Sequence, residues 1–152
     1  MRSRTAKWFI CIVKFEKVQE DGSQKKVTEQ YVVDALSFSE AEARITEEMK
    51  NYVSGEVEIA NINPAPFSEI FFSEDARADM WYKTKLQFIT IDEKTNKEKR
   101  SNVNYLVQAS NLENARKNID EVMGGTMIDY NIKDLNETPI MDVFEHTAPK
   151  SE

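Results

Sequence analysis

The stretch YVVDALSFSEAEARI, residues 31–45, predicts a strand that runs directly into a helix. Tyr31, Val33 and Ala35 lie two residues apart, which is the period of a half-buried strand, and an apolar stripe at helical spacing follows them. The stretch YLVQASNLENARKNI, residues 105–119, has the same pattern, and its matching positions come 74 residues later. The chain is therefore predicted to contain two copies of one strand–helix element.

The similarity between the two halves extends beyond these stretches. Each copy is preceded by an alternating strand and a turn and is followed by two extended pieces, at offsets of 73 or 74 residues. We interpret this as an internal duplication of a β-β-α-β-β unit. The first helix has two candidate N-caps, Ser37 and Ser39, because each precedes a glutamate by three residues.

The predicted fold class is α+β, with antiparallel sheets that each carry one helix on one face, and with the two copies related by a pseudo-two-fold axis. We expect the repeats to pack as one globular domain. The predicted divisions are a mobile basic arm at 1–6, the first repeat at 7–74, a linker at 75–79, the second repeat at 80–146 and a loose tail at 147–152.

Composition excludes several classes of function. A net charge of −7 and a pI near 4.9 disfavour general binding to duplex DNA and to anionic membranes, since both need a positive field. The longest apolar run, residues 8–13, is too short to span a bilayer or to serve as a signal peptide. A single cysteine, Cys11, agrees with a reducing compartment. We expect a cytoplasmic protein with no membrane partner.

Few residues could carry catalysis. Cys11 falls on the core face of a predicted strand, and His146, the single histidine, has no metal-ligand partner at any usual spacing. The one Gly pair, Gly124-Gly125, follows a helix instead of opening one, so no phosphate loop is predicted. We therefore predict no catalytic, metal-binding or cofactor-binding residues and no enzymatic activity. A metal-dependent enzyme built on carboxylates stays as a second alternative.

The first strand of each half has a face that points away from its helix. In the first half this face carries Trp8, Ile10 and Ile12. An exposed apolar face needs a cover, so we predict that these three residues form an interface between repeats or between copies of the chain, and that the protein is a homo-oligomer.

In the second half the same face is aromatic and basic. The predicted nucleic-acid contacts are Trp81, Lys83 and Lys85 on the strand and Lys97, Lys99 and Arg100 on the adjacent hairpin. Rings for base stacking and cations for phosphate are how single strands are held without sequence readout. Packing of Trp81 within the protein is the alternative interpretation.

The segment at 34–44, DALSFSEAEAR, together with Trp8 and Tyr31, resembles an uncharacterised family of proteins from gut anaerobic bacteria and their phages and mobile elements. The resemblance covers nearly the whole chain. It implies an intracellular bacterial or viral setting and transfers no site residues.

The predicted function is a non-enzymatic binding module for a macromolecular partner. In the implied setting it would be an accessory protein of DNA replication or recombination, or an inhibitor of a host factor. A single-stranded nucleic-acid-binding protein is the first alternative.

Overall fold

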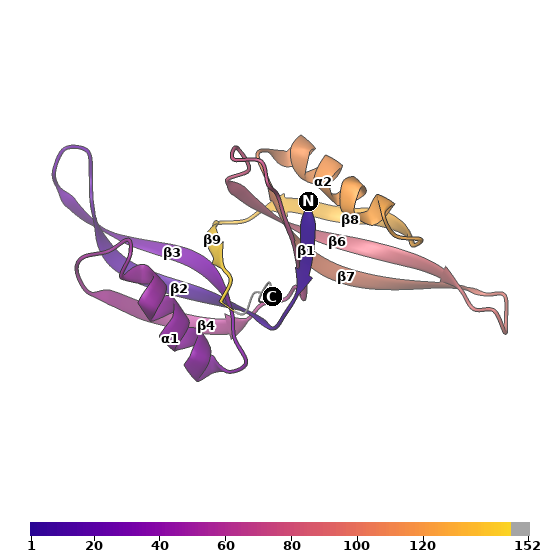
Figure 1. Ribbon diagram of the computed structural model, residues 1–152, viewed down its shortest axis with the longest axis horizontal. Coiled ribbons are helices and arrows are strands. Elements are labelled where there is room, and N and C mark those ends of the chain that lie inside the picture. Colours follow the sequence, from indigo (N-terminus) through magenta and orange to yellow (C-terminus); the bar gives the residue numbers. More distant parts are fainter. Residues whose placement is uncertain (147–152) are drawn as a thin grey trace, which may run out of the picture. The chain divides into compact units, whose positions relative to one another are not determined.

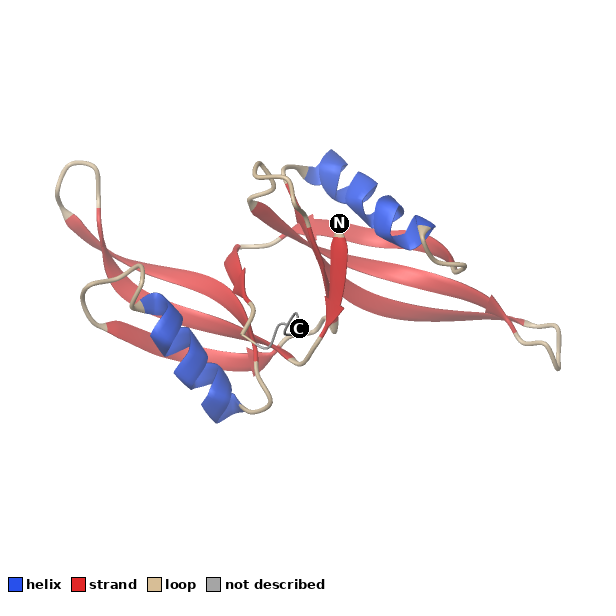
Figure 2. Cartoon of the chain, in the orientation of Figure 1, coloured by secondary structure: helices blue, strands red, loops and turns tan. Residues whose placement is uncertain are grey.

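The computed structural model describes residues 1–146, and its α+β chain divides into two compact units. Unit 1 consists of residues 1–5 and 66–138, and unit 2 consists of residues 6–65 and the chain from residue 139. Each unit contains one sheet and one helix (Figure 2). The predicted tail at 147–152 lies outside the described residues.

Unit 2 is a four-stranded sheet in the order β4-β2-β3-β9, with helix α1 on one face (Figure 1). Its strands β2 and β3 form a long antiparallel hairpin, and β4 pairs antiparallel with β2. The elements are β2 (Trp8–Val18), β3 (Gln24–Asp34), α1 (Phe38–Met49), β4 (Val57–Pro64) and β9 (Ile140–Phe144).

Unit 1 is a five-stranded sheet in the order β1-β5-β7-β6-β8, and helix α2 covers one face. The hairpin here is β6 with β7, and β8 pairs antiparallel with β6. The elements are β1 (Arg2–Thr5), β5 (Glu69–Phe72), β6 (Met80–Ile91), β7 (Glu98–Ala109), α2 (Leu112–Gly124) and β8 (Asp129–Glu137).

The helices begin at polar caps. The Ser37 hydroxyl accepts a hydrogen bond from the backbone N–H of Glu40 at 3.1 Å, so Ser37 is the cap of α1. Asn111 caps α2 in the same way through the N–H of Asn114. The expectation that α1 extends to about residue 52 and ends in a left-handed turn at Gly55 is wrong, because α1 ends at Met49. In residues 1–146, positive φ occurs in hairpin turns, at Gly22 and Asn96.

Each core lies between the helix and one face of its sheet. In unit 2 every second residue of β2 and β3 points toward α1, where Ile45 and Met49 are fully buried. Full burial of such a side chain stabilises the fold by about 1.5–3 kcal/mol. In unit 1 Ile119 and Met123 take the corresponding places. The hydrophobic periods of strand and helix are thus satisfied by the same two layers in both units.

The sheets are mixed, so the prediction of antiparallel sheets is wrong. Strand β9 pairs in parallel with β3, and β5 pairs in parallel with β7. As a result the last strand of each predicted repeat, 7–74 and 80–146, lies in the sheet of the other repeat's hairpin. Three of the four residues of β5 are buried, as expected for a parallel strand with both faces covered, and local sequence does not specify which hairpin receives such a strand.

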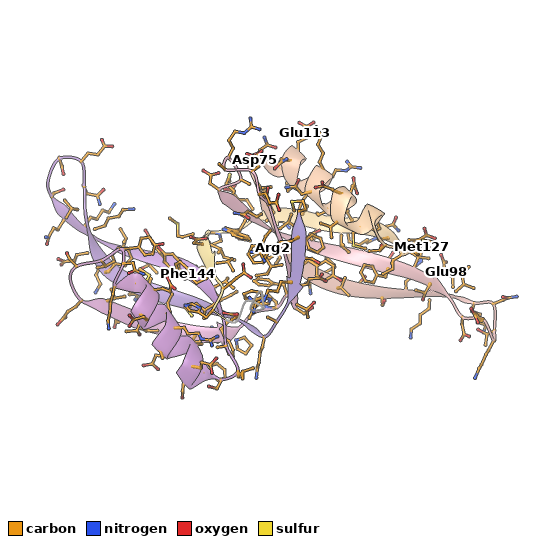
Figure 3. The ribbon with its side chains drawn as sticks, viewed as in Figure 1. Arg2, Asp75, Glu98, Glu113, Met127 and Phe144 are labelled. Carbon is orange, nitrogen blue, oxygen red and sulfur yellow. The ribbon has the colours of Figure 1, made fainter. Side chains whose placement is uncertain are left out.

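Residues Arg2–Thr5, predicted to be a mobile arm, form β1 at the edge of the unit 1 sheet and pair antiparallel with β5. The guanidinium of Arg2 lies 4.1 Å from the centroid of the Phe72 ring, which is a cation–π contact (Figure 3). Pairing with β5 gives the arm its order, and that pairing partner is 67 or more positions away in sequence.

Candidate functional site

The predicted nucleic-acid face does not offer an exposed ring. Trp81 is 2% exposed and packs edge-on against Phe72, with ring centroids 5.8 Å apart, so a base cannot stack on Trp81 in this structure. Lys83 is exposed and Lys85 is half-buried, both on the sheet face away from α2. The packing interpretation therefore holds for Trp81, whereas nucleic-acid contact by the lysines stays a prediction.

The remaining predicted contacts lie near the tip of the β6–β7 hairpin. Lys97, Lys99 and Arg100 are exposed, and the Arg100 guanidinium donates to Gln87 at 3.2 Å and to Glu98 at 3.4 Å. Arg100 pairs opposite residue 89, six positions along β6 from Lys83, which is about 20 Å. The structure thus spreads these cations along the strand instead of gathering them.

The predicted interface residues differ in exposure. Trp8 is 2% exposed, so its ring offers no free surface to a second copy of the chain. Ile10 and Ile12 are half-buried. Association of copies through this face stays a prediction that rests on the two isoleucines.

Cys11 is a buried structural thiol. Its side chain is inaccessible on the α1 face of β2, and burial raises its pKa from 9.0 to about 12. A thiol with so high a pKa is almost entirely protonated at neutral pH and is a poor nucleophile.

His146 lies in an ionic network of unit 2, which sequence reasoning missed. Its backbone N–H donates to Asp34 Oδ1 at 2.8 Å, its ring Nε2 lies 2.8 Å from Glu48 Oε1, and its ring Nδ1 lies 3.5 Å from Asp34 Oδ1. Arg44 donates to the Asp34 carbonyl, lies 3.5 Å from the Asp34 carboxylate and pairs with Glu40 at 2.8 Å. Four segments distant in sequence meet here.

Unit 1 contains a network of the same connectivity made of neutral side chains. The backbone N–H of Ser73 donates to Gln108 Oε1 at 2.9 Å, and Asn118 donates to the Gln108 carbonyl at 3.0 Å and to Asn114 at 3.3 Å. Each of these residues lies 73 or 74 positions from its ionic counterpart: Gln108 from Asp34, Asn118 from Arg44, Asn114 from Glu40, and Ser73 from His146.

The networks hold the ends of parallel strands. One joins the residue after β9 to β3 and α1, and the other joins the residue after β5 to β7 and α2. Comparison of the two halves at the constant offset is the signal that could have identified the neutral network once the ionic one was known. Within residues 1–146, no group of three or more His, Cys, Asp or Glu side chains is arranged to hold a metal ion.

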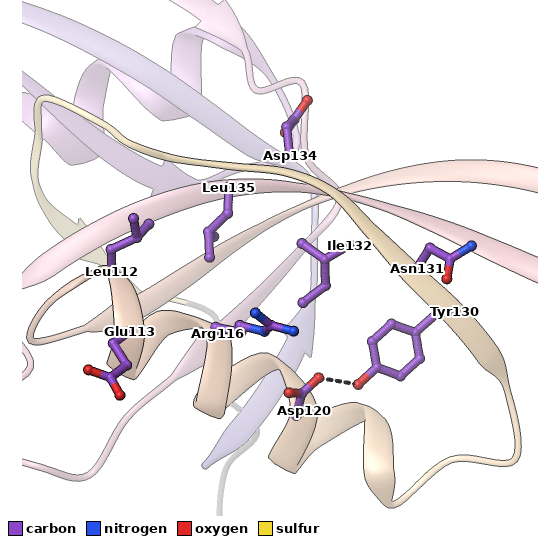
Figure 4. Close-up of a pocket in the computed structure, with 9 residues that line it drawn as sticks. All are labelled: Leu112, Glu113, Arg116, Asp120, Tyr130, Asn131, Ile132, Asp134 and Leu135. Atoms are coloured by element: carbon purple, nitrogen blue, oxygen red, sulfur yellow. Dashed lines mark hydrogen bonds between the residues drawn. The ribbon is translucent and has the colours of Figure 1, made fainter.

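The largest concave feature of unit 1 is a groove between α2 and β8, with a volume of about 970 Å³ (Figure 4). Its floor is apolar, formed by Ile132 and Leu135 of β8 and by Leu112 of α2, which is 53% exposed. Spacings of one, four and eight residues from Leu112 place the polar groups of α2 on the same helical face. These polar groups and those from β8 are Glu113, Arg116, Asp120, Tyr130, Asn131 and Asp134.

Two polar contacts organise the groove. The Tyr130 hydroxyl donates to Asp120 Oδ1 at 2.5 Å, and desolvation together with this carboxylate raises the Tyr130 pKa to about 12. Asp134 Oδ1 accepts the backbone N–H of Lys85 at 3.1 Å, beside a register shift between β6 and β8. Both carboxylates are therefore hydrogen-bond acceptors that help to position the walls of the groove.

A smaller groove of about 320 Å³ occupies the matching position in unit 2, between α1 and β4. Its lining residues precede those of the larger groove by 73 or 74 positions: Phe38, Ser39, Glu42, Ile59, Asn61 and Ile62. Glu42 is in the place of Arg116, so the matched grooves carry opposite charges at this position. Neither groove was predicted from the sequence, since each requires a helix and a strand end to be placed side by side.

Neither helix in residues 1–146 is long and apolar enough to cross a membrane. Comparison with known proteins found no curated protein and no solved structure that matches the chain significantly. A family model does match, over residues 7–146, which is more than nine-tenths of the chain. The chain therefore belongs to the family described as domain of unknown function DUF4494.

Proposed function

We propose that the protein is a non-enzymatic binding module that holds a segment of another protein in the α2–β8 groove. The observation that carries the proposal is the position of the groove along β8, the end strand of its sheet. A groove beside a sheet edge combines a place for side chains with backbone groups that a further chain can pair with.

The lining chemistry supports this function. An apolar floor with a few polar groups around it is typical of binding sites in proteins, because burial supplies affinity and polar contacts supply orientation. Leu112 contributes an exposed apolar side chain at one end, and Met127, in the loop before β8, is fully exposed (Figure 3). Exposed apolar side chains beside a groove favour contact with another protein.

The proposal that the protein is not an enzyme is supported by its reactive groups. The Cys11 thiol is buried and its pKa is raised, and the His146 ring contacts two carboxylates in the strand-holding network. In the phage or mobile-element setting implied by the resemblance, such a module would serve as an accessory protein or as an inhibitor of a host factor.

We also propose that the two halves arose by duplication. Support comes from features that recur at a constant offset: the helix caps, the two polar networks, and the register shifts at 12/13 in β2 and at 85/86 in β6. On this view one groove kept a binding role and enlarged, and the other remained small.

Site-specific photo-crosslinking tests the proposed function. A benzophenone amino acid replaces Leu112 in the larger groove or Phe38, its counterpart in the smaller groove, and the full chain is irradiated in host cells. Adducts with a defined protein at position 112 and not at position 38 would support the proposal. Equal adducts at both positions, or none at 112, would contradict it.

The nucleic-acid alternative has a separate test. Fluorescence anisotropy with labelled single-stranded oligonucleotides, at low and high salt, should show no salt-dependent binding at micromolar protein. Binding that weakens with salt and falls on replacing Lys83 and Lys85 with Gln would favour the basic sheet face instead.

A further inference from the structure

We infer that the groove binds an extended segment of a partner protein, which adds to the sheet beside β8 and places a carboxylate against Arg116. This inference rests on the proposed function and specifies the chemistry of the partner.

The edge of β8 sets the conformation of the segment. β8 is nine residues long and ends its sheet, so in the described part of the chain its outer backbone groups face no further strand. Such an edge pairs readily with an extended chain, and every second side chain of the added strand then points to one face of the sheet. On the α2 face those side chains would lie over Ile132 and Leu135.

Arg116 sets the charge of the segment. Within residues 1–146 its guanidinium forms no hydrogen bond and no ion pair, although it lines the groove between the Leu112 end and the Tyr130 end (Figure 4). The three carboxylates of the lining are each engaged: Asp120 by Tyr130, Asp134 by the N–H of Lys85, and Glu113 by Lys117 at 3.9 Å. The guanidinium is therefore the charge in this groove that a ligand would complete.

A carboxylate suits this group in geometry and in charge. The planar guanidinium presents parallel N–H donors that match the two oxygens of a carboxylate. A basic side chain at the same place would lie against Arg116 and be repelled. The net charge of −7 favours basic ligands in general, so a preference for acidic segments would have to come from local recognition.

The smaller groove supplies the matched control. It has the same apolar positions and carries Glu42 in the place of Arg116. A change at Glu42 alters the charge of the chain as a change at Arg116 does, but in a groove of about a third of the volume.

The test selects peptides with the full chain. A random twelve-residue library displayed on phage is selected on the immobilised protein, and enriched peptides are synthesised with a fluorescein label for anisotropy titration. We expect enriched peptides to contain Asp or Glu. Replacing that residue with its amide, or making Arg116→Gln, should weaken binding about ten- to a hundred-fold. Glu42→Gln should leave the affinity unchanged, and the bound peptide should slow amide hydrogen exchange in β8.

The outcomes separate this inference from the proposed function. Peptides that bind in the groove, as judged by loss of binding in Leu135→Asp, but that are basic, or insensitive to Arg116→Gln, would overturn the carboxylate assignment alone. Binding with unchanged exchange in β8 would overturn strand addition alone. Failure to select any peptide whose binding depends on the groove would overturn both. Circular dichroism of each variant verifies that the fold is retained.

Discussion

The ionic network of unit 2 should stabilise the protein more than its neutral counterpart in unit 1 does. The change Arg44→Met removes the guanidinium and keeps the length of the aliphatic chain. Asp34 then keeps a buried carboxylate, 1% exposed, that has lost its cationic neighbour. The matched change Asn118→Leu removes the corresponding donor from the neutral network, where the acceptor is the uncharged Gln108 carbonyl.

The expected magnitude follows from distance and exposure. Unit charges 3.5 Å apart attract by about 5 kcal/mol at an effective dielectric constant of 20. Water reduces this attraction because the Arg44 side chain is 19% exposed, and Asp34 keeps the backbone N–H of His146 as a donor. Removing one partner of a buried pair costs about 3–5 kcal/mol, and these features place Arg44→Met near 3 kcal/mol. Asn118→Leu should cost about 1 kcal/mol, the value of a neutral hydrogen bond.

Urea unfolding followed by circular dichroism measures both losses, and amide hydrogen exchange locates them. Protection should fall in β3 and β9 for Arg44→Met and in β5 and β7 for Asn118→Leu. The double variant with Asp34→Asn should cost less than the sum of its single changes, because the carboxylate is no longer left without its cation. Equal losses for Arg44→Met and Asn118→Leu, or additive behaviour of the double variant, would refute the reasoning.

Three further outcomes follow from the pKa shifts. Cys11, with its pKa raised to about 12, should not react with a disulfide reagent in the folded protein at pH 8 and should react once per chain in urea; labelling of the folded chain would contradict its burial. The pKa of Asp142 is raised above 3.8 by desolvation and by Glu48, so its charged form costs stability. Asp142→Asn should therefore raise the urea midpoint slightly at pH 7, and the gain should vanish as the pH falls below 3.8; a lower midpoint at pH 7 would show that the sign is wrong. Asp120→Asn should lower the Tyr130 pKa from about 12 toward 10, seen as earlier tyrosinate absorbance that is missing in Tyr130→Phe, whereas an unchanged titration would assign the shift to desolvation alone.

Much of the local structure could be predicted because it depends on neighbouring residues. Alternation in β2 and β6, the Asp-Gly turn before β3 and the polar caps are interactions over a few positions. Polar capping at Ser37 was among the two predicted choices, and the α+β class was confirmed. The candidate groove could not be predicted, since Arg116 and Tyr130 have no sequence pattern that marks them as neighbours.

The sequence by itself determined the hairpins, the helices and their apolar faces, because hydrophobic period, turn residues and caps act over distances of a few residues. The tertiary structure decided which hairpin receives β5 and which receives β9, how His146 meets Asp34 and Glu48, and that Trp81 is buried. Pairing of a short apolar strand gains nearly the same free energy on either hairpin when judged from local sequence. The choice therefore rests on contacts more than 30 residues apart, which form only when the whole chain folds.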